Sequence, residues 1–212
     1  MYKLYHYVHC PYCIRVRLAL GYLERPYESV VLAYDDEKTP ASLTGAKMLP
    51  ILTFPDGHHQ NESLAIISKL DEKKSLGTLS SQEMDDMDHI LSQISSPLHN
   101  LAMPYWIYTK EFDESSRKYF QLKHEKKRGP FGELMKKKKI FMEELSEHLE
   151  KLAGDLTPWL KGNQFGLKDI LLASHLWGAY IAPEFQFSPS IHNYLQSISQ
   201  KCRFHYHEDF CR

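Results

Sequence analysis

Two cysteines near the start of the chain, Cys10 and Cys13, are the residues best suited to chemistry. Two thiols at this spacing can act on a disulfide, because one thiolate attacks it and the other resolves the mixed disulfide that forms. The same spacing also occurs in half of a zinc site and in pairs of reduced core thiols. The elements around the two cysteines decide between these alternatives.

The cysteines lie where a predicted strand is followed by a predicted helix. Residues 2–8 are rich in aromatic and β-branched side chains, which are typical of strands. Ile14 and Leu18, followed by residues 20–22, recur at helical spacing. Cys10 should therefore stand at the start of the helix, and Cys13 should lie one turn inside it on the same face.

A helix N-terminus should make Cys10 the more acidic and more reactive of the two thiols. A free thiol has a pKa of about 8.5, so it is mostly protonated at neutral pH. The first turn of a helix offers unpaired N–H groups and a partial positive charge, and both stabilise a thiolate. Pro11 suits the first helical position, because its missing N–H would have no partner there. Cys10 is thus the predicted attacking thiol and Cys13 the predicted resolving thiol.

The rest of residues 1–72 predicts a small α/β domain. Strand, helix and strand at this spacing form a right-handed unit with parallel strands, whereas a later hairpin makes the last strand pair antiparallel. The expected order is β-α-β-α-β-β-α. After the first strand and helix come a strand at 28–32 and a helix that Thr39 caps, Pro40 begins and Gly45 ends. They are followed by a strand opened by Pro50, a return strand at 58–60 and a helix at 64–70.

Residues 84–212 are predicted to be all helical, after a polar linker at residues 73–83. Apolar side chains follow a 3.6-residue period in three stretches, at 87–101, 141–156 and 191–198. Residues 170–177 are nearly all apolar, as expected for a helix at the centre of a bundle. The predicted fold class is therefore an α/β domain followed by an all-α domain.

Composition excludes several classes of protein. Of the 212 residues, 42% are hydrophobic and 25% are charged, with a net charge of -1, so neither disorder nor general nucleic-acid binding is indicated. No signal peptide and no stretch long enough to span a bilayer is expected. Four cysteines are few for a disulfide-stapled secreted protein, so a reducing compartment, the cytoplasm, is predicted.

Three motifs together resemble the glutathione-binding proteins of the thioredoxin fold: Cys10-Pro11-Tyr12-Cys13, Leu49-Pro50-Ile51, and Glu62-Ser63 opening a helix. The first is the glutaredoxin signature, and the helical second half looks like a glutathione transferase architecture. The combination resembles the glutaredoxin 2 family of long, two-domain bacterial glutaredoxins. The resemblance implies a thioredoxin-like glutaredoxin domain followed by a glutathione transferase-like helical bundle.

The resemblance also implies a role for each matching residue. Cys10 would be the nucleophile and Cys13 the resolving thiol, and the two would form a redox-active disulfide. Five residues would bind glutathione: Tyr12, Leu49, Pro50, Glu62 and Ser63. In the family pattern a cis bond before the proline leaves the backbone of the preceding residue free to pair with the cysteinyl part of glutathione, while the Glu-Ser pair holds the γ-glutamyl end.

Each motif has a simpler meaning when it is taken alone. Pro50 alone would be an ordinary proline at the start of a strand, and Glu62-Ser63 alone would be a helix cap. Residues 136–139 are four consecutive lysines, which most often form a solvated helix face. The glutathione site is therefore an expectation that depends on all three motifs occurring together.

The predicted function is that of a glutathione-dependent thiol-disulfide oxidoreductase. Its partners would be glutathione, as cosubstrate, and glutathionylated or disulfide-containing proteins. No metal, nucleic acid or membrane is expected as a partner, and a monomer is expected. One alternative is a transferase that conjugates glutathione to electrophiles. Another is a non-catalytic scaffold of the same fold, with an iron–sulfur cluster held through Cys10, although the tight Pro-Tyr turn is expected to disfavour a cluster.

The start of the helix after Phe165 departs from the wider transferase pattern. A Ser or Thr commonly caps this helix and an Asp follows three residues later, whereas here Gly166 stands at the cap and Asp169 is kept. Glycine is an acceptable N-cap residue, so at most a modest loss of stability is expected.

The C-terminal stretch has no role in this scheme. It holds Cys202 and Cys211, together with His205 and His207. A metal site and a second, regulatory disulfide are both compatible with these residues. A mobile tail without a site is the favoured expectation.

Overall fold

The first half of the chain is built on a four-stranded mixed sheet. The structure is a computed structural model that describes residues 1–205. Its strands are β1 (Tyr2–His6), β2 (Tyr27–Val31), β3 (Ile51–Thr53) and β4 (His59–Gln60), in the order β2-β1-β3-β4. β2 is parallel to β1, whereas β3 and β4 are antiparallel to their neighbours. The predicted β-α-β unit and the later hairpin are both confirmed.

Three helices complete this half: α1 (Pro11–Tyr22), α2 (Lys38–Thr44) and α3 (Ser63–Leu70). The predicted order of seven elements is therefore confirmed. The prediction that Thr39 caps α2 and that Pro40 is its first residue is wrong, because α2 begins at Lys38 and the Asp36 carboxylate accepts the Thr39 N–H at 2.9 Å. Gly45 ends α2 with φ 78°, a left-handed conformation that favours glycine.

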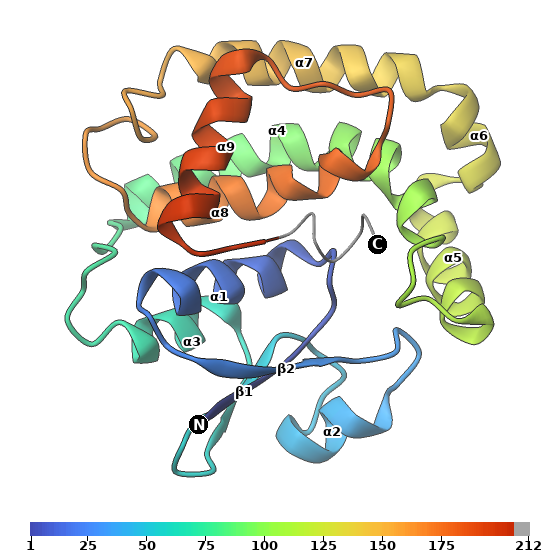
Figure 1. Cartoon of the computed structure of the whole chain (residues 1–212). Coiled ribbons are helices and arrows are strands. Elements are labelled where there is room, and N and C mark those ends of the chain that lie inside the picture. Colours follow the sequence, from blue (N-terminus) through green and yellow to red (C-terminus); the bar gives the residue numbers. More distant parts are fainter. Residues whose placement is uncertain (206–212) are drawn as a thin grey trace.

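The second half is helical, as predicted. Its elements are α4 (Ser81–Trp106), α5 (Glu114–Arg128), α6 (Phe131–Lys136), α7 (Lys138–Ala153), α8 (Leu167–Leu176), a 3-10 helix at Trp177–Ile181 and α9 (Pro189–Lys201). α8 is buried along most of its length and lies between α1 and the outer helices (Figure 1). The nearly continuous apolar stretch therefore does form the centre of the bundle.

The two halves pack directly on each other. α1 lies between the sheet and α8, whereas α2 lies on the side of the sheet away from the bundle (Figure 1). Because α1 is covered on nearly all sides, even its two arginines are buried. The Arg15 guanidinium lies 4.7 Å from the centre of the Tyr12 ring, and that of Arg17 lies 4.7 Å from the Phe204 ring. Stacking on aromatic faces lets a guanidinium lie in such an interior.

The segment between α3 and α4 spans residues 71–80 and packs against the bundle. The Asp71 carboxylate accepts the N–H groups of Ser75 and Leu76, each at 2.7 Å. The Leu76 carbonyl in turn accepts the Leu167 N–H, at the start of α8, at 2.8 Å. The division at residues 72 and 84 stays a prediction, although α4 already begins at Ser81, inside the predicted linker.

The chain beyond α9 does not form a mobile tail at residues 202–204, so that expectation is wrong there. Cys202 and Phe204 are buried, and a Cβ atom at Gly21 would lie 1.7 Å from the Cys202 carbonyl oxygen. Glycine in α1 therefore allows the end of α9 to approach closely. Cys211 and His207 lie outside the described residues, so the suggested Cys202–Cys211 disulfide and the His205–His207 metal site stay untested.

Two features bear on nucleic-acid binding and membrane spanning, which the sequence does not indicate. The four lysines span the junction of α6 and α7, where three are exposed and Lys138 pairs with Glu184. In the described part of the chain, residues 1–205, no helix combines the length and the apolar character that crossing a membrane requires.

Candidate active site

The two cysteines lie at the predicted turn between strand and helix. Cys10 is the N-cap of α1, with φ -67° and ψ 121°, and Pro11 is the first helical residue. The Cys10 carbonyl accepts the Ile14 N–H at 2.9 Å and closes the first helical turn. Cys10 is half-buried, whereas Cys13 is fully buried. Only the first sulfur is thus placed to meet a substrate, which matches the predicted order of attack.

The surroundings lower the pKa of Cys10 and raise that of Cys13. The largest contribution at Cys10 is a hydrogen bond from the Cys13 side chain, and it is helped by the backbone N–H groups of Cys13 and Tyr12. The nearby Arg15 charge adds to these, and together they outweigh the effect of burial. At Cys13, burial and the hydrogen bond to Cys10 both raise the pKa. Cys10 therefore holds the thiolate and Cys13 the proton.

Removing the donor at position 13 should raise the pKa of Cys10. We expect Cys13→Ala to move the midpoint of Cys10 alkylation by iodoacetamide to higher pH, because the largest stabilising hydrogen bond is lost. Cys13→Ser is the matched variant, since its hydroxyl can still donate, and its midpoint should move less. Equal midpoints for Cys13→Ala and the unaltered protein would contradict this account.

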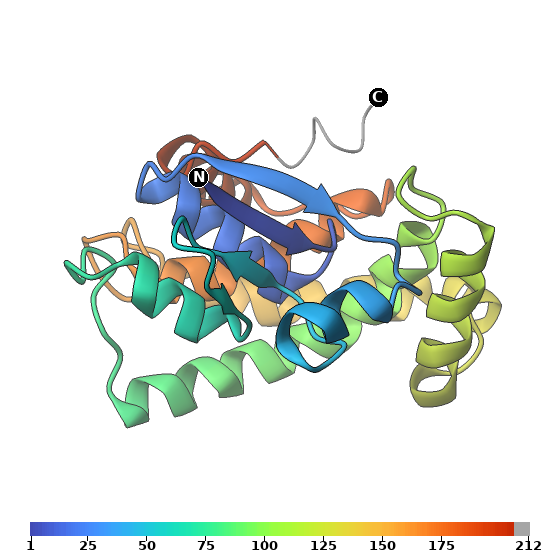
Figure 2. The same cartoon turned by 90° about the horizontal axis from the view of Figure 1, so that it is seen from below.

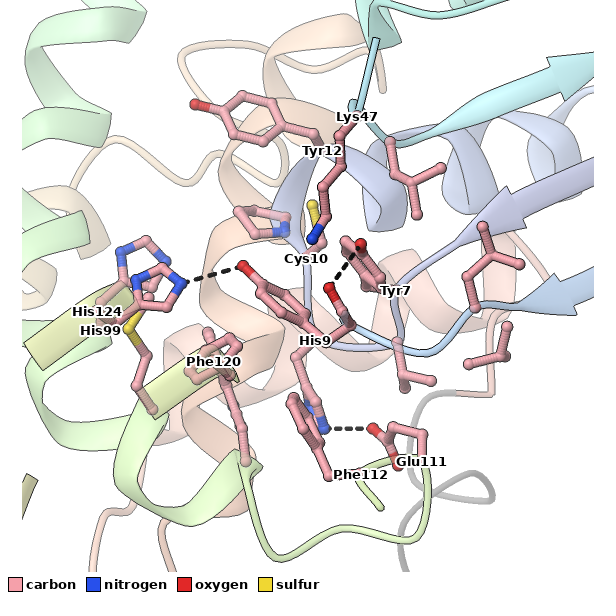
Figure 3. Close-up of a pocket in the computed structure, with 18 of the residues that line it drawn as sticks. Tyr7, His9, Cys10, Tyr12, Lys47, His99, Glu111, Phe112, Phe120 and His124 are labelled. Carbon is pink, nitrogen blue, oxygen red and sulfur yellow. Dashed lines mark hydrogen bonds and ion pairs between the residues drawn. The ribbon is translucent and has the colours of Figure 1, made fainter. Parts of the chain in front are cut away.

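A pocket of about 410 Å³ opens beside Cys10, between the two halves of the chain. Cys10, Tyr12 and Leu49 lie on its wall from the first half. Aromatic rings form much of the opposite wall, among them Trp106, Phe112 and Phe120. Figure 3 shows Cys10, Tyr12 and Lys47 on one side of the pocket and Phe120, His99 and His124 on the other. A reacting disulfide can therefore extend from the sulfur toward the helical half.

One polar contact ties the residue before the nucleophile to the helical half. His9 is buried, and its ring stacks on Trp106 at a centroid distance of 5.2 Å. His9 Nε2 lies 2.6 Å from Glu111 Oε1 (Figure 3). It also lies 3.0 Å from Thr109 Oγ1. Burial raises the pKa of Glu111, but the hydrogen bond and charge of His9 act against it, and the net shift is downward. This contact holds the loop that carries Cys10.

A second set of contacts joins the segment after β2 to α5. The Tyr34 hydroxyl lies 3.0 Å from His124 Nε2, and the Tyr34 N–H donates to Ser116 Oγ at 3.1 Å. The Ser116 hydroxyl donates to Asp35 at 2.6 Å. Figure 2 shows the segment between β2 and α2 reaching α5 at this point. These bonds close one side of the pocket.

The structure places the five predicted glutathione residues in two groups. Tyr12 and Leu49 line the pocket with Cys10, and the predicted cis bond between Leu49 and Pro50 is confirmed. Glu62 and Ser63 are not among the residues that line the pocket. Ser63 is the buried first residue of α3, and Glu62 has φ 66°, which is uncommon for a residue other than glycine. Such strained positions often belong to binding sites.

Sequence reasoning did not identify His9, Glu111, Tyr34 or His124 as parts of the site. Each of these residues contacts a partner that is distant in the sequence, and no local pattern marks either residue of a pair. The position of His9 directly before Cys10 was the only available signal. Within residues 1–205, no three side chains of His, Cys, Asp or Glu are grouped so that they could hold a metal ion.

Comparison with known proteins places the chain in a family. The family model for the glutaredoxin 2 C-terminal domain matches residues 86–210, and the model for the glutathione S-transferase N-terminal domain matches residues 4–78. Glutaredoxin 2 of Escherichia coli K12 is 32% identical over 154 residues, which cover 71% of each chain.

Solved structures share the fold of the whole chain. Glutaredoxin 2 from Salmonella typhimurium, crystallised in complex with glutathione, superposes with a TM-score of 0.87 at 24% identity and covers 97% of this chain and 96% of its own. A glutathione S-transferase from Rhodospirillum rubrum superposes with a TM-score of 0.69 at 17% identity, over 96% and 90% of the two chains. The family model, the sequence relative and the cysteine geometry agree: this chain belongs to the glutaredoxin 2 family of glutathione-dependent oxidoreductases.

Proposed function

We propose that the chain reduces mixed disulfides between glutathione and other thiols, with Cys10 as the nucleophile. The observation that carries this proposal is the half-buried Cys10 sulfur at a helix N-terminus, with its pKa lowered by a donor from Cys13 and with an open pocket beside it. A thiolate that is both exposed to the pocket and stabilised at neutral pH is what disulfide attack requires.

The proposed reaction consists of two thiol–disulfide exchanges. The Cys10 thiolate attacks the glutathione sulfur of the mixed disulfide, the sulfur–sulfur bond breaks, and the other thiol leaves as a thiolate that takes a proton from water. The thiolate of a second glutathione then attacks the Cys10–glutathione disulfide. This step releases glutathione disulfide and restores the Cys10 thiolate, so glutathione is oxidised and the substrate thiol is reduced.

Cys13 offers a second route for protein disulfides. After Cys10 has formed a mixed disulfide with a substrate, Cys13 can displace the bound thiol and form a Cys10–Cys13 disulfide, which two molecules of glutathione then reduce. The hydrogen bond between the two side chains supports this route, because it places Cys13 against Cys10. The buried, protonated Cys13 must first lose its proton, so this route should be the slower one for small mixed disulfides.

We assign glutathione binding to Tyr12, Leu49, Pro50, Glu62 and Ser63. The family pattern supports the assignment, and so does the backbone of Leu49, which makes no hydrogen bond with any other residue in the range 1–205. Its N–H and carbonyl groups are therefore available to the cysteinyl backbone of glutathione. The Ser63 hydroxyl and N–H, at the start of α3, suit a carboxylate, and Glu62 suits an ammonium group.

Ser63 provides a direct test of this assignment. We expect Ser63→Ala to raise the KM for glutathione about tenfold, because one hydrogen bond to a charged group is lost, while kcat changes little. Ser68→Ala is the matched control, since Ser68 is exposed on the same helix. Steady-state kinetics with glutathione as the varied substrate measure both variants. An unchanged KM in Ser63→Ala would remove Ser63 from the binding site.

A transferase reaction is the second candidate, and the aromatic wall of the pocket favours it. An apolar electrophile would find Trp106, Phe112 and Phe120 beside the glutathione thiol. The two activities are compared on one preparation, with a glutathione mixed disulfide coupled to glutathione reductase and with a chlorinated aromatic acceptor. Much faster turnover of the mixed disulfide supports the proposal, whereas much faster turnover of the aromatic acceptor supports the transferase.

An iron-containing, coloured preparation isolated without oxygen would support the scaffold alternative.

We also propose that the protein acts as a cytoplasmic monomer on glutathionylated or disulfide-containing proteins. Its chemistry requires reduced thiols, which the cytoplasm maintains. Gel filtration with light scattering tests the monomer, and a dimer mass would contradict it.

A further inference from the structure

The far wall of the pocket carries an arginine that pairs with no carboxylate of residues 1–205. Arg128, the last residue of α5, lines the pocket together with His99, His124 and Lys127. Its guanidinium donates to Asn100 Oδ1 at 2.8 Å and lies 3.4 Å from His99 Nδ1. Both partners are side chains without negative charge. The arginine is thus held in place without losing its net charge.

The charges around the pocket leave this positive end unbalanced. Among the described residues that line the pocket, Glu111 is the sole carboxylate, and it is paired with His9. Lys47, on the opposite wall, is paired with Glu37 at 3.3 Å. Neither Arg128 nor Lys127 forms an ion pair with any residue in the described range. A ligand that brings a negative charge to this end would meet no competing carboxylate among the described residues that line the pocket, apart from the paired Glu111.

The two histidines beside Arg128 are neutral, and the positive charge of Arg128 helps to lower the pKa of both. Burial lowers the pKa of His99 to about 3, with the Arg128 charge as the next contribution. Burial likewise lowers the pKa of His124 to about 4, and the charges of Lys123 and Arg128 add to it. Figure 3 shows both histidines on the side of the pocket away from the His9–Glu111 pair. They can donate or accept hydrogen bonds without adding charge.

An aromatic wall lies beside this cationic end. The Tyr34 ring meets Phe120 edge-on at a centroid distance of 4.5 Å, and Phe120 lies 4.2 Å from the His124 ring. Trp106 and Phe112 extend the same wall on the side of His9. An apolar planar group attached to the reacting sulfur would pack here, and a carboxylate at its far end could meet Arg128.

We propose that this part of the pocket binds the leaving thiol of a glutathione mixed disulfide, and that it selects aromatic or similarly planar thiols that carry a carboxylate. The inference rests on the proposed function, because it names the substrate class of the same site. Glutathione would lie on the wall formed by the first half, and the leaving thiol on the wall formed by α4 and α5. After the Cys10 attack, the carboxylated thiol departs as a thiolate and is protonated by water, while Cys10 keeps the glutathione.

Binding of unreactive thioethers tests the site without turnover. S-(4-carboxybenzyl)glutathione and S-benzylglutathione differ only by the carboxylate, and calorimetry measures the affinity of each for the full chain. We expect the carboxylate to strengthen binding about tenfold, because it gains a charge-assisted hydrogen bond from Arg128. Arg128→Met should remove this difference and leave the affinity for S-benzylglutathione unchanged. Arg128→Lys should keep part of the difference.

Lys126→Met is the matched control, because Lys126 is an exposed cation on the same helix that does not line the pocket. This variant should keep the tenfold difference. Equal affinities of the two thioethers for the unaltered protein would overturn the inference. So would an Arg128→Met variant that weakens both thioethers equally, since that result indicates a general disturbance of the pocket.

Turnover separates failure of this inference from failure of the proposed function. The substrates are the glutathione mixed disulfides of 4-(mercaptomethyl)benzoate, benzyl mercaptan and 2-mercaptoethanol. We expect kcat/KM to be about tenfold higher for the first than for the second, and Arg128→Met should abolish that ratio. Reduction of all three at similar kcat/KM would overturn the inference and leave the proposed function intact. Reduction of none would contradict the proposed function and this inference with it.

Discussion

Replacing Cys10 with serine should lower kcat/KM for a glutathione mixed disulfide by about a thousandfold or more. A serine hydroxyl is not ionised near neutral pH and cannot form the covalent bond with the glutathione sulfur on which both exchanges depend. In the unaltered protein, the hydrogen bond from Cys13 and the helix N-terminus stabilise the Cys10 thiolate. The serine variant has no thiolate for them to stabilise. The coupled assay with glutathione reductase measures the loss.

Two matched variants show that this loss is specific to Cys10. Cys13→Ser should keep most of the activity toward small mixed disulfides, because glutathione itself can resolve the Cys10 intermediate. Cys202→Ser should also stay active, since Cys202 is buried at the end of α9 and burial raises its pKa to about 12. Full activity of Cys10→Ser, or loss of activity in Cys202→Ser without loss of folding, would contradict the assignment.

Replacing Asp169 with alanine should destabilise the fold by about 4 kcal/mol. Asp169 is buried at the start of α8, where its carboxylate accepts three hydrogen bonds, from the N–H groups of Leu160 and Gly166 and from the Tyr194 hydroxyl, at 2.8–2.9 Å. The variant would leave all three donors without this partner, and two of them belong to the buried residues Leu160 and Tyr194. Urea unfolding followed by circular dichroism measures the change in the free energy of unfolding.

Tyr194→Phe is the control for this prediction, because it removes one donor and leaves the carboxylate with two. We expect it to cost about 1 kcal/mol. A cost for Asp169→Ala no larger than that of Tyr194→Phe would show that the carboxylate does not organise this region. Glycine suits position 166 because a Cβ atom there would lie 2.9 Å from the Leu76 carbonyl oxygen, and Asp169 still accepts the Gly166 N–H.

The parts of the site that local sequence determines were predictable. The strand–turn–helix around Cys10 and the proline at the first helical position each follow from residues that are neighbours in the chain, whereas the cis bond before Pro50 was expected only from the family resemblance. The glutaredoxin-like motifs likewise lie at short spacing. Periodic apolar residues located the helices of the second half, because burial imposes the same 3.6-residue pattern in any bundle.

Contacts between distant segments could not be predicted from one sequence. Tyr34 and His124 lie 90 residues apart, and nothing in either neighbourhood marks the pair. The same holds for the pairing of His9 with Glu111 and for the place of Arg128 in the pocket. Arg15 and Arg17 resemble ordinary surface cations in the sequence, and their burial follows only from the packing of α1 against α8 and of Arg17 against Phe204. Local patterns specify elements, whereas packing decides which faces meet.

Mass spectrometry of a trapped intermediate tests most directly whether Cys10 carries the glutathionyl group. The Cys13→Ser variant is incubated with the mixed disulfide of glutathione and 2-mercaptoethanol, without free glutathione, and then digested under acid. We predict one glutathionyl group per chain, located on the peptide that contains Cys10. A glutathionyl group on the peptide that contains Cys202, a 2-mercaptoethanol group on Cys10 in its place, or no modification at all would contradict the proposed mechanism.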